Sequence, residues 1–366
     1  MRAFLLYSRF YDFDKRCHYI GGVETYLRNL CDVLRSVKII PVVIFPDEEG
    51  RVLMLDGVQL IGVATSNHWK SDLRNKAEEL GNLDRDLLIF GSSTLITKSR
   101  FKKVIAIQHG IYWDTVEFKG HSLVGVLALL ARVMQGKRQL DLHSLVSRMV
   151  CVDLNYINWM RALSVSNRYP YVYIPNFADI SEPVRAKCDN GCVRVLFARR
   201  FEPIRGCGLL MDVMPRILSN YPNVELTIAG SGSMEKELHR AFDSFPRVVF
   251  THYDASESVA FHERFDIALV PSIASEGTSL SLLEAMSAGC AVVATDVGGM
   301  SNIVLSSHNG LLVSPNPGDF YAAIVSLVQN QTLRQRLSQN ARQTVEDSFS
   351  RSRWEMEWIN LLGEII

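Results

Sequence analysis

The chain has 366 residues, more than one ordinary domain holds, and this length predicts two or three domains. Hydrophobic residues make up 48% and charged residues 21%, which is typical of a packed globular protein and excludes a disordered one. The formal net charge is zero, and we expect no nucleic-acid partner. Residues 1–175 hold 23 basic and 17 acidic side chains, whereas the remainder holds 16 and 22. This asymmetry indicates either that the first half faces an anionic partner or that charge is scattered by chance.

Cysteine usage and the start of the chain bear on the cellular compartment. The seven cysteines form no CxxC pair, which favours a reducing compartment and argues against a zinc site. The apolar stretch that follows Met1 is too short for a signal peptide and predicts a first buried strand. We therefore expect a cytoplasmic location.

Apolar runs alternate with amphipathic stretches along the first half, a pattern typical of parallel βαβ units. Strands are predicted at residues 3–7, 39–45, 87–91, 104–108, 149–152 and 171–174. Helices are predicted near residues 23–36, 71–80, 122–135 and 155–165.

The second half repeats the alternation after a break at residues 175–191, where prolines, an asparagine and a glycine interrupt the pattern. Strands are predicted at 193–198, 224–229, 248–250, 267–270, 291–295 and 310–313, and helices near 206–219, 234–243, 256–264, 279–288 and 317–329. We interpret the chain as an α/β protein with two Rossmann-like domains and a ligand-binding cleft between them. Their predicted bounds are 1–178, completed by an amphipathic helical segment at 350–366, and 190–349.

Two carboxylates flank a glycine- and serine-rich loop that follows the predicted strand 267–270. Glu276 lies in this loop, and Glu284 lies about one and a half turns into the next predicted helix. The N-terminus of that helix would present unpaired N–H groups and a positive dipole end to a ligand. An anion between two carboxylates indicates a phosphate joined to hydroxyl-rich sugars.

A pair of arginines follows the predicted strand 193–198. Arg200 stands at the end of the strand, and Arg205 comes five residues later at the start of the next helix. Two fixed cations could stabilise a departing diphosphate. The neighbouring Arg199 is interpreted either as an extra phosphate contact or as a surface cation.

Glycine pairs mark two other predicted strand ends. Gly21 and Gly22 open the first predicted helix, with Glu24 close behind, and adjacent glycines let a backbone approach a phosphate closely. Gly230 and Gly232 follow the predicted strand 224–229. Each glycine pair is also compatible with a simple tight turn.

Together these motifs resemble those of the retaining glycosyltransferases of family 4, which have the GT-B fold. The resemblance covers nearly the whole chain and is strongest from about residue 193 to 313. It implies that the first domain binds the acceptor, that the second binds the nucleotide-sugar donor, and that the last helix crosses back to the first domain.

The resemblance also implies roles for individual residues. Glu276 would lie by the donor sugar, Glu284 would accept hydrogen bonds from the ribose hydroxyls, and Arg200 and Arg205 would clamp the diphosphate. Backbone groups at the helix N-terminus and at the glycine turns would complete the donor site; these residues are Gly21, Gly22, Gly230, Gly232, Gly277, Thr278, Ser279 and Leu280.

A histidine at the end of the predicted strand 104–108 is the second catalytic candidate. Family members place a histidine here beside the donor sugar and acceptor, and His109 matches that position. A structural histidine is about equally compatible with the sequence. Tyr112, Trp113 and Asp114 are weaker candidates for acceptor contacts.

We therefore expect a retaining glycosyltransferase that needs neither a metal nor a cofactor and that acts in lipopolysaccharide or other surface polysaccharide assembly. The Asp84–Asp86 pair precedes a strand and so lies at the wrong end of a sheet for a metal site. A sugar-nucleotide epimerase of GT-B fold and a non-catalytic GT-B partner protein remain as alternatives. The acceptor would be a saccharide or a lipid-linked saccharide.

The apolar stretch 123–134 is too short to span a bilayer and is followed by Lys137 and Arg138. It is compatible either with a buried core helix or with a helix at an anionic membrane surface. A peripheral position on the inner face of the cell membrane is the corresponding expectation.

Overall fold

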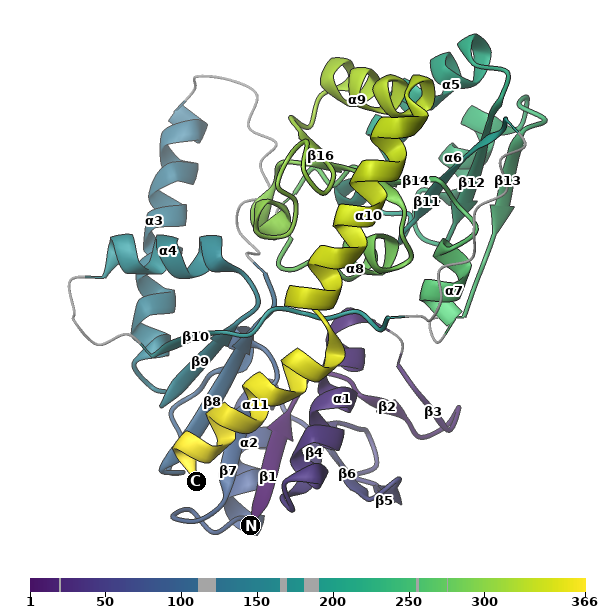
Figure 1. Ribbon diagram of the computed structural model, residues 1–366. Helices are drawn as coiled ribbons and strands as arrows, with labels where there is room; N and C mark the ends of the chain where they lie inside the picture. The colour runs from purple at the N-terminus through teal and green to yellow at the C-terminus, as the bar shows by residue number, and fades with distance from the viewer. Residues whose placement is uncertain (20, 111–122, 165–169, 181–190, 255–256, 275) are drawn as a thin grey trace. The chain divides into compact units, whose positions relative to one another are not determined.

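The computed structural model describes residues 1–19, 21–110, 123–164, 170–180, 191–254, 257–274 and 276–366, with only the backbone for 123–132 (Figure 1). The chain divides into two compact units. Unit 1 comprises Met1–His109, Phe118–Pro175 and Trp354–Ile366, and unit 2 comprises Gly110–Glu117 and Asn176–Arg353.

Unit 1 is built on an eight-stranded sheet with the order β10-β9-β8-β7-β1-β4-β6-β5. All neighbouring strands are parallel except β5 and β6. Its strands are continuous apolar runs because parallel strands are covered on both faces. The bounds are β1 Arg2–Leu6, β4 Ile40–Pro46, β5 Val52–Leu55, β6 Val58–Val63, β7 Leu87–Phe90, β8 Lys103–Gln108, β9 Arg148–Cys151 and β10 Tyr171–Tyr173.

The helices of unit 1 follow the predicted alternation. They are α1 Gly22–Ser36, α2 Trp69–Leu80, α3 Leu123–His143, α4 Leu154–Leu163 and most of α11 Arg351–Ile365, with a 3-10 turn η1 Ser93–Leu95. Helix α11 contributes the fully buried Trp354 and Trp358 to this unit. The C-terminal segment therefore returns to unit 1, as the family resemblance implies.

The sequence analysis missed two hairpins in unit 1. Strands β5 and β6 are joined by Asp56 and Gly57, both with positive φ (49° and 76°), which is the signature of a tight hairpin turn. The second hairpin pairs β2 Tyr11–Asp12 with β3 Cys17–His18. The ring of Phe13 between them stacks on Phe45, so this insert is packed against the sheet.

Unit 2 contains a six-stranded, fully parallel sheet with the order β13-β12-β11-β14-β15-β16. The sequential order turns back at β11, which pairs with β12 on one side and β14 on the other. Ligands of open α/β sheets bind where the strand order reverses, beyond the carboxyl ends of the strands. The bounds are β11 Val193–Ala198, β12 Val224–Ala229, β13 Val248–Thr251, β14 Ile267–Val270, β15 Ala291–Thr295 and β16 Leu311–Val313.

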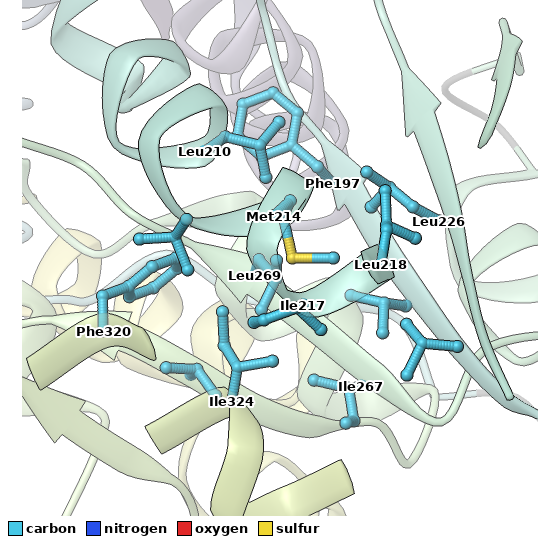
Figure 2. Close-up of a cluster of buried hydrophobic side chains, with 14 of the residues drawn as sticks. Phe197, Leu210, Met214, Ile217, Leu218, Leu226, Ile267, Leu269, Phe320 and Ile324 are labelled. Atoms are coloured by element: carbon cyan, nitrogen blue, oxygen red, sulfur yellow. The ribbon is translucent and has the colours of Figure 1, made fainter. Parts of the chain in front are cut away.

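Alternate residues of these strands enter two separate cores. Val195 and Phe197 join a cluster with α5 and α9 (Figure 2), whereas Leu196 and Ala198 join a cluster with α8 and α10. The helices are η2 Pro203–Arg205, α5 Cys207–Asn220, α6 Glu235–Phe242, α7 Ser258–His262, α8 Leu280–Ser287, η4 Gly298–Asn302, α9 Pro317–Gln329 and α10 Gln331–Ser348. Helix α10 is the one long helix of this unit that the sequence analysis did not predict.

Candidate functional site

A cluster of three charged side chains lies where the strand order of unit 2 reverses. Strand β11 delivers Arg199 at its carboxyl end, the 3-10 turn η2 ends in Arg205, and the loop after β14 carries Glu276. Glu276 Oε1 contacts Nη2 of Arg199 and lies 2.7 Å from Nη1 of Arg205. Ser272 also donates its hydroxyl to the same carboxylate oxygen. The structure thus brings together the predicted Glu276 and Arg205.

The cluster is largely shielded from water. The side chains of Arg199, Glu276 and Arg205 are 4%, 9% and 21% exposed. Burial alone would raise the pKa of Glu276, but the charges of Arg199 and Arg205 outweigh it and lower this pKa to about 2. Burial also lowers the pKa of Arg199, and the charge of Glu276 opposes that shift. The cluster is therefore ionised at neutral pH and carries one positive charge in excess.

The sequence analysis gave the diphosphate contact to Arg200 and left the neighbouring Arg199 open. Arg200 is exposed and forms no salt bridge with any described residue, whereas Arg199 is buried against Glu276. Reading Arg199 as a surface cation is therefore wrong. The first residue after Ala198 is still held by the sheet, and the next one has already turned outward into solvent.

Arg199 also retains unused hydrogen-bonding capacity. Its Nη1 is buried and has no hydrogen-bond partner among the described residues. A buried guanidinium normally satisfies its donors, because an unpaired one costs about 1–3 kcal/mol. An anion at this point would accept from Nη1.

Two glycines bring the neighbouring loops close to the cluster. Gly206 has φ 83°, and a Cβ there would overlap the carbonyl oxygen of Pro271. Gly230 has φ 140°, and a Cβ there would overlap the carbonyl oxygen of Arg199. Gly206 and Gly230 both need to be glycine for the backbone itself. The predicted turn that begins at Gly230 therefore has a structural reason besides ligand binding. Gly232 also lines a cavity of about 620 Å³ beside α6.

The loop before α8 supplies the backbone groups expected at the site. Gly277, Thr278 and Ser279 are buried, and Ser279 is the N-cap of α8, which begins at Leu280. The side chain of Ser279 makes no capping hydrogen bond. The first N–H groups of a helix need acceptors, so this terminus is suited to an anion.

Glu284 lies in the second turn of α8, half-buried. Burial raises its pKa to about 7, although the hydroxyl of Ser258 and the charge of Arg199 favour the ionised form. Near neutral pH this carboxyl exchanges between a proton donor and an acceptor-only carboxylate. Both forms can hydrogen-bond sugar hydroxyls.

In unit 1, the predicted glycines open α1. Gly21 is the N-cap and Gly22 the first helical residue. The carboxylate of Glu24 folds back beside Gly21, where a Cβ would overlap it, and Arg9 Nε donates to it at 2.8 Å. Glu24 is buried and Arg9 is half-exposed, so a guanidinium is held close to this helix N-terminus.

His109 follows β8 and is packed inside unit 1. Its Nε2 lies 3.1 Å from the carbonyl oxygen of Gly91, and the ring of Tyr26 packs against its ring at 5.1 Å. A carbonyl oxygen only accepts, so Nε2 carries the proton and Nδ1 is left as an acceptor. Burial lowers the pKa of His109 to about 4, so the ring is neutral at physiological pH.

The remaining residues singled out in the sequence are the candidate acceptor contacts and the Asp84–Asp86 pair. Tyr112, Trp113 and Asp114 lie outside the described residues. Asp86 accepts from the backbone of Arg2 and Asn82, and Asp84 pairs with Lys102, so both carboxylates have structural partners. Within the described ranges, no group of three or more His, Cys, Asp or Glu side chains is placed to hold a metal ion. No helix in the described part of the chain has the length and apolarity needed to cross a bilayer.

Comparison with known proteins indicates a family for part of the chain. Residues 192–330 match the family model Glycosyl transferases group 1. This segment of unit 2 is therefore similar to the group 1 glycosyl transferases. The matched segment contains all three members of the charged cluster, together with α8.

Curated relatives of this chain align over part of their length. The phosphatidyl-myo-inositol mannosyltransferase of Mycobacterium tuberculosis is 29% identical over 221 residues, which are 57% of this chain and 57% of that protein. The glycogen synthase of the same organism is 30% identical over 167 residues, 44% of this chain and 40% of that protein. The chain thus matches just over half the length of the first relative and less than half of the second.

Solved structures establish the fold over the whole chain. The sucrose-phosphate synthase of Thermosynechococcus elongatus superimposes with a TM-score of 0.76 at 16% identity, covering 99% of this chain and 98% of that one. HepE of Anabaena, in complex with UDP-glucose, has a TM-score of 0.73 at 15% identity and full coverage of both chains. The fold of the chain is therefore GT-B, as the sequence predicted.

Proposed function

We propose that this protein is a glycosyltransferase that moves a sugar, with retention of anomeric configuration, from a nucleotide-diphosphate sugar to an acceptor hydroxyl. The observation that carries the proposal is the cluster of Arg199, Arg205 and Glu276 beside the N-terminus of α8. It combines an excess cation, an unpartnered guanidinium donor and free helix N–H groups. These are the groups that a diphosphate requires.

The same groups account for catalysis. The bond between the anomeric carbon and the diphosphate oxygen breaks, and a bond between that carbon and the acceptor oxygen forms. The proton of the acceptor hydroxyl passes to an oxygen of the departing diphosphate. Arg199 and Arg205 stabilise the charge that grows on that diphosphate, so the reaction needs no metal ion.

Two carboxylates orient the donor in this proposal. Glu276, fixed between the two arginines, accepts hydrogen bonds from the sugar, and Glu284 accepts them from the ribose. His109, neutral and with Nδ1 available, accepts a hydrogen bond from a sugar hydroxyl. Support comes from the solved structure of HepE in complex with UDP-glucose.

The proposed acceptor is a saccharide, free or lipid-linked, in lipopolysaccharide or other surface polysaccharide assembly. Support comes from the name of the mycobacterial relative, a mannosyltransferase of a phosphatidylinositol. The middle of α3 fits a peripheral position on the inner face of the membrane. Val133 and Met134 are 53% and 66% exposed there, and Lys137 and Arg138 are exposed one turn further on.

Thermal shifts with UDP-, GDP- and dTDP-sugars test donor binding, because a ligand of the native state raises its melting temperature. With the donor so identified, NMR of the product reports its anomeric configuration, and EDTA reports dependence on a metal. Glu276→Ala and Arg205→Ala should each reduce transfer at least about 100-fold while leaving the fold intact. Wild-type rates in folded variants, or an inverted product, would contradict the proposal.

Membrane attachment is tested separately by sedimentation with vesicles. Vesicles of phosphatidylglycerol should retain the protein, and those of phosphatidylcholine should not. Substituting Val133 and Met134 by glutamine should release it, whereas the same change at the exposed Leu305 of unit 2 should have no effect. Equal retention of all variants would overturn this part.

A further inference from the structure

The loop that presents backbone N–H groups before α8 is hydrogen-bonded to Asn176, the first residue of unit 2 after Pro175. A hydrogen bond that fixes this loop is called a tie below. Asn176 Nδ2 donates to the carbonyl oxygen of Thr278 at 2.6 Å, across 102 positions of sequence. A carbonyl oxygen only accepts, so the amide nitrogen of Asn176, and not its oxygen, faces Thr278.

A second tie holds the other end of this loop. The backbone N–H of Gly299, in the turn after β15, donates to the carbonyl oxygen of Glu276 at 2.6 Å. In a planar trans peptide, the carbonyl of one residue and the N–H of the next point in opposite directions. Fixing the carbonyls of Glu276 and Thr278 therefore fixes the N–H groups of Gly277 and Ser279, directed away from the two ties.

Those two N–H groups are not used by the fold. Neither Gly277 N nor Ser279 N has a hydrogen-bond acceptor among the described residues. Their orientation is thus maintained by ties on the opposite side of the loop. Such an arrangement is preorganised for a ligand that accepts hydrogen bonds.

The side chain of Asn176 is only partly satisfied by hydrogen bonds in the described part of the chain. Its Oδ1 is buried and has no hydrogen-bond partner in the described part of the chain. Buried polar groups that lack partners are uncommon in native proteins and occur at functional sites.

We propose that Asn176 is a positioning residue that holds the N–H groups of Gly277 and Ser279 toward the phosphate oxygens of a nucleotide diphosphate. It acts through the carbonyl of Thr278. The inference rests on the proposed function for the identity of the ligand, but the tie can be measured without any ligand.

Asn176→Asp tests the tie with almost no change in size. The carboxylate has no donor and faces the Thr278 carbonyl with like partial charge, so the loop should lose its orientation. We expect the dissociation constant for the nucleotide-diphosphate sugar to rise at least about tenfold. Acidification should restore affinity relative to wild type, because a protonated aspartic acid again donates to Thr278.

Ser287→Ala is the matched control. Ser287, at the other end of α8, donates its hydroxyl to the carbonyl oxygen of Asp179 at 2.5 Å, so it ties the same junction segment to the same helix. This variant should lose stability but keep the donor affinity of wild type. Nucleotide-sugar affinity equal to wild type in Asn176→Asp, with a loss of stability like that of the control, would overturn the proposal.

Hydrogen exchange of the ligand-free proteins separates this inference from the proposed function. Amides of residues 277–280 should exchange faster in Asn176→Asp than in wild type and in Ser287→Ala. Unchanged exchange at these amides would refute the tie. Failure of the wild-type protein to bind any nucleotide sugar would instead count against the proposed function.

Discussion

The indole Nε1 of Trp358 donates a hydrogen bond to the hydroxyl of Tyr26 at 2.9 Å, across 332 positions of sequence. Both side chains are buried in unit 1, and the ring of Tyr26 also packs against those of His109 and Trp354. The last helix of the chain is thereby joined to the first helix and to the neighbourhood of His109.

Tyr26→Phe should destabilise unit 1 by about 1–3 kcal/mol, because the buried N–H of Trp358 loses its acceptor. Urea unfolding followed by tryptophan fluorescence measures the change. Ile359→Ala, an exposed position on the same helix, should stay within about 0.5 kcal/mol of wild type. Equal effects of the two substitutions would show that the hydrogen bond contributes nothing.

The two adjacent arginines should respond differently to the same substitution. Arg199→Met should weaken binding of the nucleotide sugar by about 10- to 100-fold, since a buried charge-assisted contact is lost. Arg200→Met should leave affinity within about twofold, because this side chain is exposed and unpaired among the described residues. Isothermal titration with each variant measures both. A larger loss in Arg200→Met would restore the assignment made from the sequence.

Glu284 should make stability depend on pH. Its folded pKa of about 7 lies above the ordinary value of 4.5, so folding favours the protonated form. The folded state is therefore penalised as pH rises from about 4.5 through 7, by up to about 3 kcal/mol. Glu284→Gln removes this penalty. Urea unfolding should show the variant gaining stability over wild type at pH 8 and little at pH 5, and a difference independent of pH would refute the account.

His109 should remain neutral throughout the physiological range. Its pKa of about 4 lies below the ordinary 6.5, since burial disfavours the charged ring. NMR titration of labelled histidine, assigned with His109→Gln, should therefore show no change in this ring between pH 8 and 5.5. A midpoint near 6.5 for His109 would contradict the burial argument.

Much of the fold was predictable because apolar runs such as those of β7 and β14 are short and continuous, and because Gly91 follows the first and Pro271 the second. The hairpin of β5 and β6 was missed although Asp56 and Gly57 carry its turn signal. Helix α10 was missed because it is strongly polar, with only Leu337, Ala341 and Val345 buried.

Part of the site could be predicted from the sequence. Motif spacing and the family resemblance identified Glu276, Glu284, Arg200 and Arg205 as candidates, but they left open whether Arg199 is a phosphate contact or a surface cation. Its burial against Glu276 is a tertiary contact that no local pattern signals. The hydrogen bond from Asn176 to Thr278 could not be predicted either, because no sequence pattern signals a hydrogen bond between residues 102 positions apart.

The path of the chain has a consequence for engineering. Residues 176–353 enter and leave unit 2 side by side, with Ala178 bridged to Ser350 and Arg351 paired with Asp179. Apart from Gly110–Glu117, unit 2 is therefore an insert whose two ends meet, and a cut at that meeting point removes residues 176–353 as a single segment. Chimaeras that exchange this segment between relatives would show whether it determines the choice of the proposed donor sugar.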